Sequence, residues 1–168
     1  ASTGEVACFG ENLYEAFLKA MISTGFEMPK KKTALISIGK LEEKADFLPS
    51  ARKLVNMGYH LYATPGTAEL FKENGLPVTV VYKKDSGQSP DFAEIIKKDK
   101  VDWVINIPRN YSHEEMTLGY TIRRLTIDNN IPLTTNVPVA KLMVDTLEQY
   151  TADDLKIEDW SAYPNEGS

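Results

Sequence analysis

The sequence has very few of the residues that form disulfides or bind metals. Its 168 residues include one cysteine, Cys8, and two histidines, His60 and His113. A single cysteine cannot form an internal disulfide, and two histidines so far apart lack the spacing of a metal-binding motif. The sequence therefore predicts no metal site, and Cys8 is interpreted as a small, buried apolar residue.

Positive charge and long apolar runs are also scarce. Lysine and arginine total 19 against 24 aspartates and glutamates, which gives a formal net charge of -5. Such a chain has no broad basic face for nucleic acid or an anionic membrane surface, so any anion site must be local. No apolar run is long enough to span a bilayer, and no signal-peptide pattern is present. Because the first residue is Ala1 and not methionine, we expect a fragment or a processed product.

Common nucleotide-binding and catalytic motifs are absent as well. No G-x-G-x-x-G follows the first expected strand, and G-x-x-x-x-G-K-[ST] occurs nowhere in the chain. No nucleophile, base and orienting group gather at one predicted edge of the sheet. The sequence therefore predicts no catalytic residue.

The chain does contain a regular alternation of apolar strands and amphipathic helices. Strands are expected at 33–39, 59–64, 77–83, 101–108 and 131–136, and helices at 11–24, 44–58, 67–75, 89–100, 115–130 and 137–150. This alternation predicts βαβ units and a doubly wound α/β domain over residues 29–150, with a five-stranded, mainly parallel sheet and helices on both faces. A helical segment precedes that domain, and an acidic tail, residues 151–168, follows it.

Polar residues are expected at one edge of this sheet. Ligands of such sheets bind at the carboxyl ends of the strands. Five cationic side chains are within reach of those ends: Lys40, Lys44, Lys83, Lys84 and Arg109. Because the whole chain is acidic, this local positive charge favours an anion site over a merely solvated edge.

The stretch "YATPGTAE", residues 62–69, lies at that edge. Pro65 and Gly66 predict a chain reversal, which places Thr67 at the N-cap of the next helix. Backbone N–H groups and the positive end of the helix dipole would then meet two threonine hydroxyls, a geometry that suits an anion. The alternative is a plain strand-to-helix turn with one capping threonine.

Several motifs resemble the large subunit of carbamoyl phosphate synthetase. "ASTGEVACFGE" and "GENLYEAFLKAM" resemble the last segment of its second ATP-grasp half. The pattern G-Y-x-L-x-A-T-x-G-T of residues 58–67, "VINIP", and "YTIRR" followed by "IPLTTN" resemble the allosteric domain that comes next, whose fold is shared with methylglyoxal synthase. The resemblance implies the end of a catalytic half at 1–28, a methylglyoxal synthase-like domain at 29–150 and a tail at 151–168.

The resemblance also implies a binding site for an allosteric effector. Lys44, Thr64, Thr67 and Lys83 match positions that grip phosphate in nucleotide-regulated synthetases. Thr64, Thr67, Tyr82 and Asn106 fit the N-acetylglutamate site of urea-cycle enzymes, but Arg109 and Gly119 stand where asparagines are expected there. The effector-binding set is Lys44, Thr64, Gly66, Thr67, Tyr82, Lys83, Asn106 and Arg109. The effector stays open between a UMP, IMP, UTP or phosphoribosyl pyrophosphate type and N-acetylglutamate.

By the same resemblance, this chain alone is not an enzyme. Ser89 and Arg109 stand where methylglyoxal synthase has catalytic aspartates, and neither can act as a carboxylate base. ATP and Mg belong to the catalytic domains of the parent synthetase, so no cofactor is expected here. The partners implied are the effector, the rest of the large subunit and a possible homodimer, in the cytoplasm or the mitochondrion. The alternatives are a stand-alone methylglyoxal synthase-like enzyme and a bridging domain without an effector.

Overall fold

The computed structural model describes residues 7–84, 86–98, 100–109 and 113–150, so the predicted tail, 151–168, lies outside the described residues. In chain order the elements are α1 (Leu13–Ser23), β1 (Thr33–Ile38), α2 (Leu41–Asn56), β2 (His60–Ala63), α3 (Pro65–Glu73), β3 (Thr79–Val80), α4 (Phe92–Lys97), β4 (Trp103–Ile107), α5 (His113–Asp128), β5 (Leu133–Thr134) and α6 (Val137–Gln149). Strands and helices alternate from β1 onward, as predicted.

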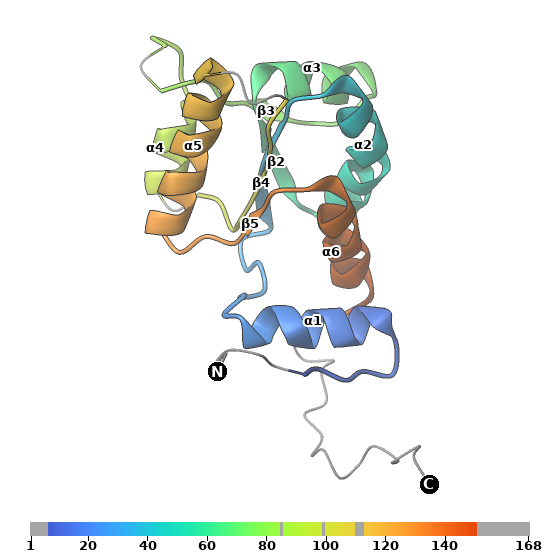
Figure 1. Cartoon of the computed structure of the whole chain (residues 1–168). Coiled ribbons are helices and arrows are strands. Elements are labelled where there is room, and N and C mark those ends of the chain that lie inside the picture. Colours follow the sequence, from blue (N-terminus) through green and yellow to red (C-terminus); the bar gives the residue numbers. More distant parts are fainter. Residues whose placement is uncertain (1–6, 85, 99, 110–112, 151–168) are drawn as a thin grey trace, which may run out of the picture.

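The strands form one sheet in the order β3-β2-β1-β4-β5, and every pairing among them is parallel. The predicted α/β fold is therefore confirmed, with a sheet that is parallel throughout instead of mainly so. Helices α4 and α5 cover one face, and α2, α3 and α6 cover the other (Figure 1). Strands β2 and β3 lie on one side of β1, and β4 and β5 lie on the other. The switch in strand order is therefore between β1 and β4.

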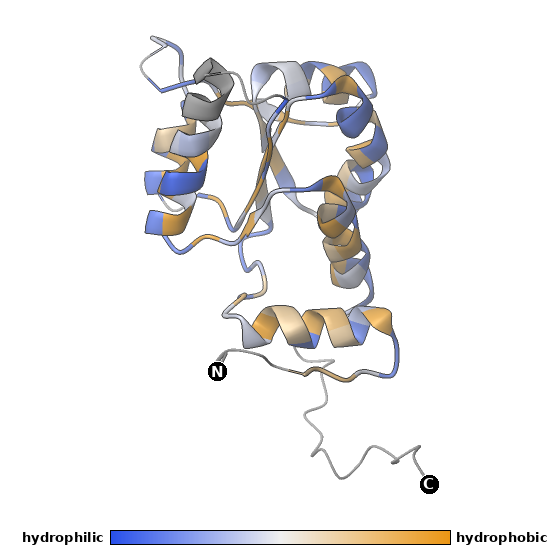
Figure 2. Cartoon of the chain, viewed as in Figure 1, coloured by the Kyte–Doolittle hydropathy of each residue, from blue (hydrophilic) through white to orange (hydrophobic). Residues whose placement is uncertain are grey.

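Burial on both faces explains the continuous apolar runs of the central strands. In β1, Leu35 faces the core under α4 and α5, and Ile36 faces the core under α2, α3 and α6; both are fully buried. Every residue of β4 is buried. Figure 2 shows hydrophobic residues along the strands and on the helix sides that face them. Sequences of this kind suit a parallel sheet because neither face is left to water.

The first helix is part of the same core. Leu18 of α1 is fully buried in the cluster that contains Phe26 and Met143. Asn12 caps the helix by accepting hydrogen bonds from two backbone N–H groups of its first turn, and its amide bonds to the hydroxyl of Tyr150. Helix α1 therefore packs beside the end of α6 (Figure 1). A domain boundary at residue 28 stays a prediction.

The third strand and the fourth helix are shorter than predicted. Strand β3 ends at Val80, because the main chain of Tyr82 hydrogen-bonds to the segment Pro90–Phe92 and not to β2. Helix α4 begins at Phe92, and the side chain of Asp91 caps it by accepting from the Glu94 N–H at 2.7 Å. The helix predicted from residue 89 therefore starts three residues later.

The described residues contain neither a candidate membrane span nor a candidate metal-binding cluster. None of the helices there is both long and apolar enough for a membrane span. Nowhere in that part of the chain do three or more histidine, cysteine, aspartate or glutamate side chains gather as they would to bind a metal ion.

Candidate anion-binding site

A cavity of about 190 Å³ lies at the carboxyl edge of the sheet. It is formed by the ends of β1 and β4 together with residues of α2, α3 and α5. Its described lining residues are Ser37, Ile38, Gly39, Lys44, Thr64, Gly66, Thr67, Asn106, Ile107, Pro108, Arg109 and Gly119. Six of the eight residues of the predicted effector-binding set are among them: Lys44, Thr64, Gly66, Thr67, Asn106 and Arg109.

The turn predicted at Pro65 and Gly66 is wrong. Helix α3 begins at Pro65, so Thr64 is the N-cap residue and Thr67 lies inside the first turn. Proline suits the first helical position because it has no N–H to leave unpaired. Gly66 is not among the described residues with positive φ, so its backbone is helical and makes no reversal. Residues at the N-terminus of α3 nevertheless line the cavity, and the positive end of a helix dipole favours an anion there.

The two threonines have different roles. Thr64 is half-buried, and its hydroxyl lies 3.3 Å from that of Ser37, which also lines the cavity. Thr67 is fully buried. Its hydroxyl accepts from the Ile38 N–H at 3.1 Å and donates to the Ile38 carbonyl at 3.2 Å. Thr67 therefore joins α3 to the end of β1, and Thr64 and Ser37 present the more accessible hydroxyls.

Replacing Thr67 by valine tests this structural role. Valine keeps the shape but leaves the Ile38 N–H and carbonyl without their partner, so we expect stability to fall by about 1–3 kcal/mol. Urea unfolding at constant m-value measures the loss. Thr67→Ser keeps the hydroxyl and is the matched control. A valine variant as stable as the serine variant would contradict the role assigned to Thr67.

Lys44 and Arg109 place two positive charges at the cavity. Lys44 projects from α2, and its Nζ donates to the Gly66 carbonyl at 2.9 Å. Burial, and then the positive charge of Arg109, lower the pKa of Lys44 from 10.5, while Glu69 acts in the opposite direction. No carboxylate occurs among the described lining residues. An anion bound between the two cations would relieve their repulsion.

Gly39, which the sequence analysis did not select, controls the position of Arg109. Its N–H donates to the Ile107 carbonyl at 2.8 Å, so the segment after β4 lies against the end of β1. A Cβ atom on Gly39 would lie 2.2 Å from the backbone nitrogen of Arg109. Only glycine permits this approach. In the sequence, this close approach is indicated by a glycine at the end of the first expected strand.

Asn106 and Gly119 form the wall on the α5 side. Asn106 is 2% exposed, and its Nδ2 donates to the Gly119 carbonyl at 3.0 Å. A Cβ atom on Gly119 would lie 3.2 Å from Nη1 of Arg123. The guanidinium of Arg123 therefore occupies space that a larger residue at position 119 would need.

The other two residues of the predicted set are elsewhere. Tyr82 is half-buried, and Lys83 is exposed; neither lines the cavity. Ser89 also lies outside the lining, where its hydroxyl donates to Glu94 at 3.4 Å. Effector contacts by Tyr82 and Lys83 remain predictions that this geometry does not support.

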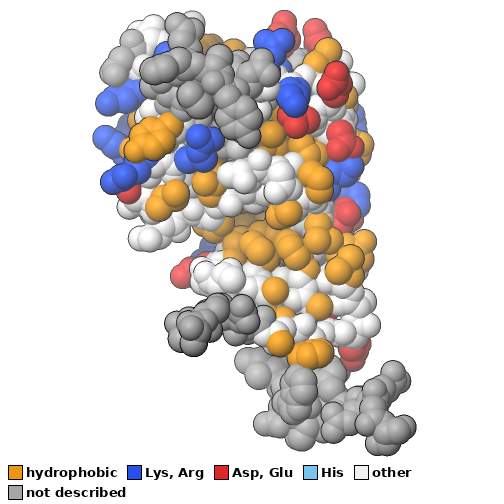
Figure 3. Space-filling model, viewed as in Figure 1, with side chains coloured by type: hydrophobic (Ala, Val, Ile, Leu, Met, Phe, Trp, Pro, Cys, Tyr) orange, Lys and Arg blue, Asp and Glu red, His pale blue; other side chains and the backbone are white. Residues whose placement is uncertain are grey.

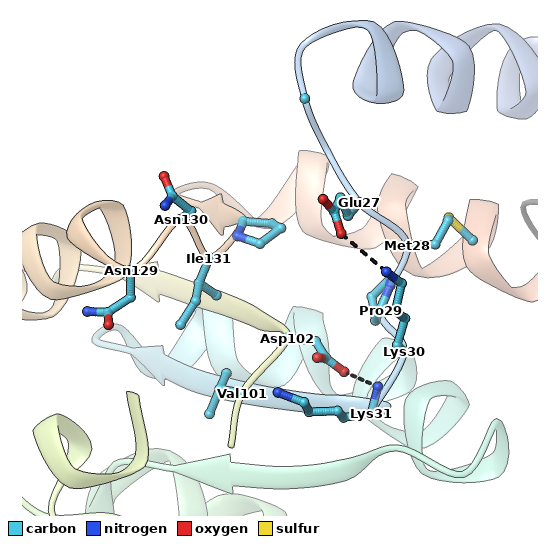
Figure 4. A pocket seen from close by; sticks show the side chains of 12 residues that line it. Glu27, Met28, Pro29, Lys30, Lys31, Val101, Asp102, Asn129, Asn130 and Ile131 are labelled. Carbon is cyan, nitrogen blue, oxygen red and sulfur yellow. Dashed lines mark hydrogen bonds and ion pairs between the residues drawn. The ribbon is translucent and has the colours of Figure 1, made fainter. Parts of the chain in front are cut away.

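A larger cavity, about 440 Å³, lies at the opposite edge, where the strands begin (Figure 4). The segment that leads into β1 and the loop after α5 form its walls. Both of its carboxylates already have partners: Glu27 pairs with Lys30 at 3.5 Å, and Asp102 accepts from the Lys31 backbone N–H at 2.6 Å. Because doubly wound sheets bind ligands at the carboxyl ends of their strands, the smaller cavity is the candidate site.

The fold and the cavity together define a doubly wound α/β domain with a polar site at the switch in strand order. A methylglyoxal synthase from Elizabethkingia anophelis has a similar fold, with a TM-score of 0.50 and 18% sequence identity over 68% of this chain and 78% of that one. At that identity the likeness concerns the fold alone.

The chain belongs to the MGS-like domain family, whose model matches residues 46–135. The multifunctional protein pyr1-3 of Dictyostelium discoideum is 44% identical over 168 residues, which cover 95% of this chain and 7% of that protein. The human mitochondrial carbamoyl-phosphate synthase [ammonia] is 41% identical over 164 residues, which cover 93% of this chain and 10% of that protein. The chain thus spans a tenth or less of these two relatives. The resemblance to the methylglyoxal synthase-like domain of carbamoyl phosphate synthetases is confirmed.

Proposed function

We propose that this chain is the effector-binding regulatory domain of a carbamoyl phosphate synthetase. The observation that carries the proposal is the pair Lys44 and Arg109, which line one cavity beside the N-terminus of α3 with no carboxylate among the described lining residues. Cations, hydroxyls and a helix N-terminus together favour an anionic ligand. The relatives that are carbamoyl-phosphate synthases supply the context for a regulatory role.

A phosphorylated effector of the UMP, IMP, UTP or phosphoribosyl pyrophosphate type is the first candidate. A cavity of about 190 Å³ has room for a phosphoryl group, while the remainder of a nucleotide would extend along the edge of the sheet. Lys44 and Arg109 suit a dianion. N-acetylglutamate is the second candidate, because Thr64 and Asn106 line the same cavity. Arg109 and Gly119 in place of asparagines favour the phosphorylated class.

The proposed mode of action is a shift in equilibrium. An effector that binds one state of the synthetase better than another displaces the population toward that state. The chemistry with ATP and Mg is assigned to the catalytic domains of the parent protein. The alternative of a methylglyoxal synthase-like enzyme requires a carboxylate base in the cavity. The described lining offers lysine, arginine, threonine, serine and asparagine instead.

A thermal-shift panel of the six compounds UMP, IMP, UTP, phosphoribosyl pyrophosphate, N-acetylglutamate and ornithine tests the proposal. A ligand at a hundredfold excess over its Kd should stabilise the chain by about 2.7 kcal/mol. We expect a phosphorylated member to do so, and the stabilisation at the same ligand concentration to fall to about 0.4–1.4 kcal/mol in Lys44→Met, whose affinity should be ten- to a hundredfold lower. No shift with any member would favour the bridging domain. Formation of methylglyoxal from dihydroxyacetone phosphate would favour the enzyme.

A further inference from the structure

A second cavity lined by cations lies between α4 and α5. Its volume is about 180 Å³, and its described lining residues are Lys84, Ala93, Lys97, Tyr120, Thr121, Arg124 and Leu125. It shares no described lining residue with the cavity at the strand ends. Lysine and arginine side chains gather on the side of the molecule where α4 and α5 lie (Figure 3).

Three separate segments supply its positive charge. Lys84 follows β3, Lys97 is in the last turn of α4, and Arg124 belongs to α5. No carboxylate is among the described residues that line it, although acidic residues outnumber basic ones in the chain as a whole. Solvated helix faces usually carry interspersed charges of both signs. Cations that converge on one hollow therefore indicate an anion site.

Arg124 forms an ion pair within α5. Its Nε donates to both carboxylate oxygens of Asp128, at 3.0 and 3.1 Å. This contact uses one nitrogen of the guanidinium and orients the plane of the group. The guanidinium also carries two terminal nitrogens, which belong to the planar fork that binds phosphate well.

The apolar lining adds shape. Ala93 is 4% exposed and forms a small, rigid part of the wall, and Leu125 is half-buried. Tyr120 is 59% exposed on α5, one turn before Arg124. A large aromatic ring beside cations can pack against a planar or apolar part of a ligand.

We propose that this cavity is a second anion site, which binds the phosphoryl group of a small molecule. A phosphoryl group has up to two negative charges and three acceptor oxygens, so it can contact several cations at once better than a single carboxylate can. Nucleic acid would need a broad basic surface, which a chain of net charge -5 lacks. The inference does not depend on the proposed function, because it rests on different residues.

Titration of the ¹⁵N-labelled chain with inorganic pyrophosphate, followed by amide chemical shifts, tests this second site. We expect the Ala93 and Thr121 amides to titrate as one set and the Gly39 and Gly66 amides as another. Lys97→Gln should raise the Kd of the first set at least fivefold and change that of the second set less than twofold. Lys44→Met should do the reverse.

Lys98→Gln is the matched control, because Lys98 adjoins Lys97 but lies outside the cavity lining and pairs with Glu94. It should leave both Kd values within twofold of those of the unmodified chain. The proposal fails if the Ala93 and Thr121 amides do not shift, or if Lys97→Gln and Lys98→Gln have equal effects. Loss of the Gly39 and Gly66 set alone would instead count against the proposed function.

Discussion

Gly39→Ala is expected to weaken both the fold and effector binding. The new Cβ atom would lie 2.2 Å from the backbone nitrogen of Arg109 and 2.4 Å from its Cα, and backbone atoms cannot yield as a side-chain tip can. Gly39 is not among the described residues with positive φ, so the cost comes from the contact and not from backbone conformation. Relief requires the segment after β4 to move away from β1.

Overpacking of this kind costs about 1–3 kcal/mol and occasionally more. Displacement of Arg109 should also remove a charge-assisted contact with the effector, which is worth roughly 1.5–3 kcal/mol, or about a tenfold loss of affinity or more. Urea unfolding and calorimetry with the effector found in the panel measure the two effects.

Gly66→Ala is the matched control for Gly39→Ala. Both glycines line the same cavity, but a Cβ atom on Gly66 would meet only the flexible end of Lys44, at 3.2 Å. Alanine there should leave stability nearly unchanged, since the residue is helical and exposed. Equal losses in the two variants would show that the close approach between β1 and Arg109 does not determine the stability of this edge.

The fold could be predicted because its signals are local. Strands β1 and β4 are mostly apolar and buried on both faces, and each is followed by a helix. Such runs have few alternatives to a parallel sheet covered by helices. The position of the cavity could be predicted in the same way, because the carboxyl ends of parallel strands meet at one edge of the sheet. Lys44 of α2 meets Asn106 of β4 and Arg109, which follows β4, at that edge.

The details that sequence reasoning missed depend on contacts between distant parts of the chain. Thr67 was assigned to the ligand because a Pro-Gly pair usually marks a turn, but its hydroxyl binds the backbone of Ile38. Tyr82 and Lys83 were assigned to the effector site by the resemblance, and the third strand was expected to run to residue 83. It ends at Val80, and Tyr82 pairs with Asp91 instead. Neither contact has a local signature.

Lys44→Met is expected to weaken binding of a phosphorylated effector ten- to a hundredfold, because a charge-assisted hydrogen bond contributes roughly 1.5–3 kcal/mol. Methionine keeps much of the apolar stem, so the charge is the main loss. Lys40→Met is the matched control, since Lys40 is exposed and adjoins the cavity without lining it. Calorimetry of both variants measures the difference.

The dependence on pH separates the charge of Lys44 from its packing. Burial and the charge of Arg109 lower its pKa in the folded chain from 10.5. Without effector, stability should therefore rise with pH across the window from that lowered value to 10.5, because the unfolded chain keeps the proton longer. A bound anion favours the charged ammonium, so effector binding should take up protons in this window and affinity should fall as pH rises. Calorimetry in buffers of different ionisation enthalpy measures that uptake. It should disappear in Lys44→Met and persist in Lys40→Met, and an uptake that survives in Lys44→Met would place the responsible group elsewhere.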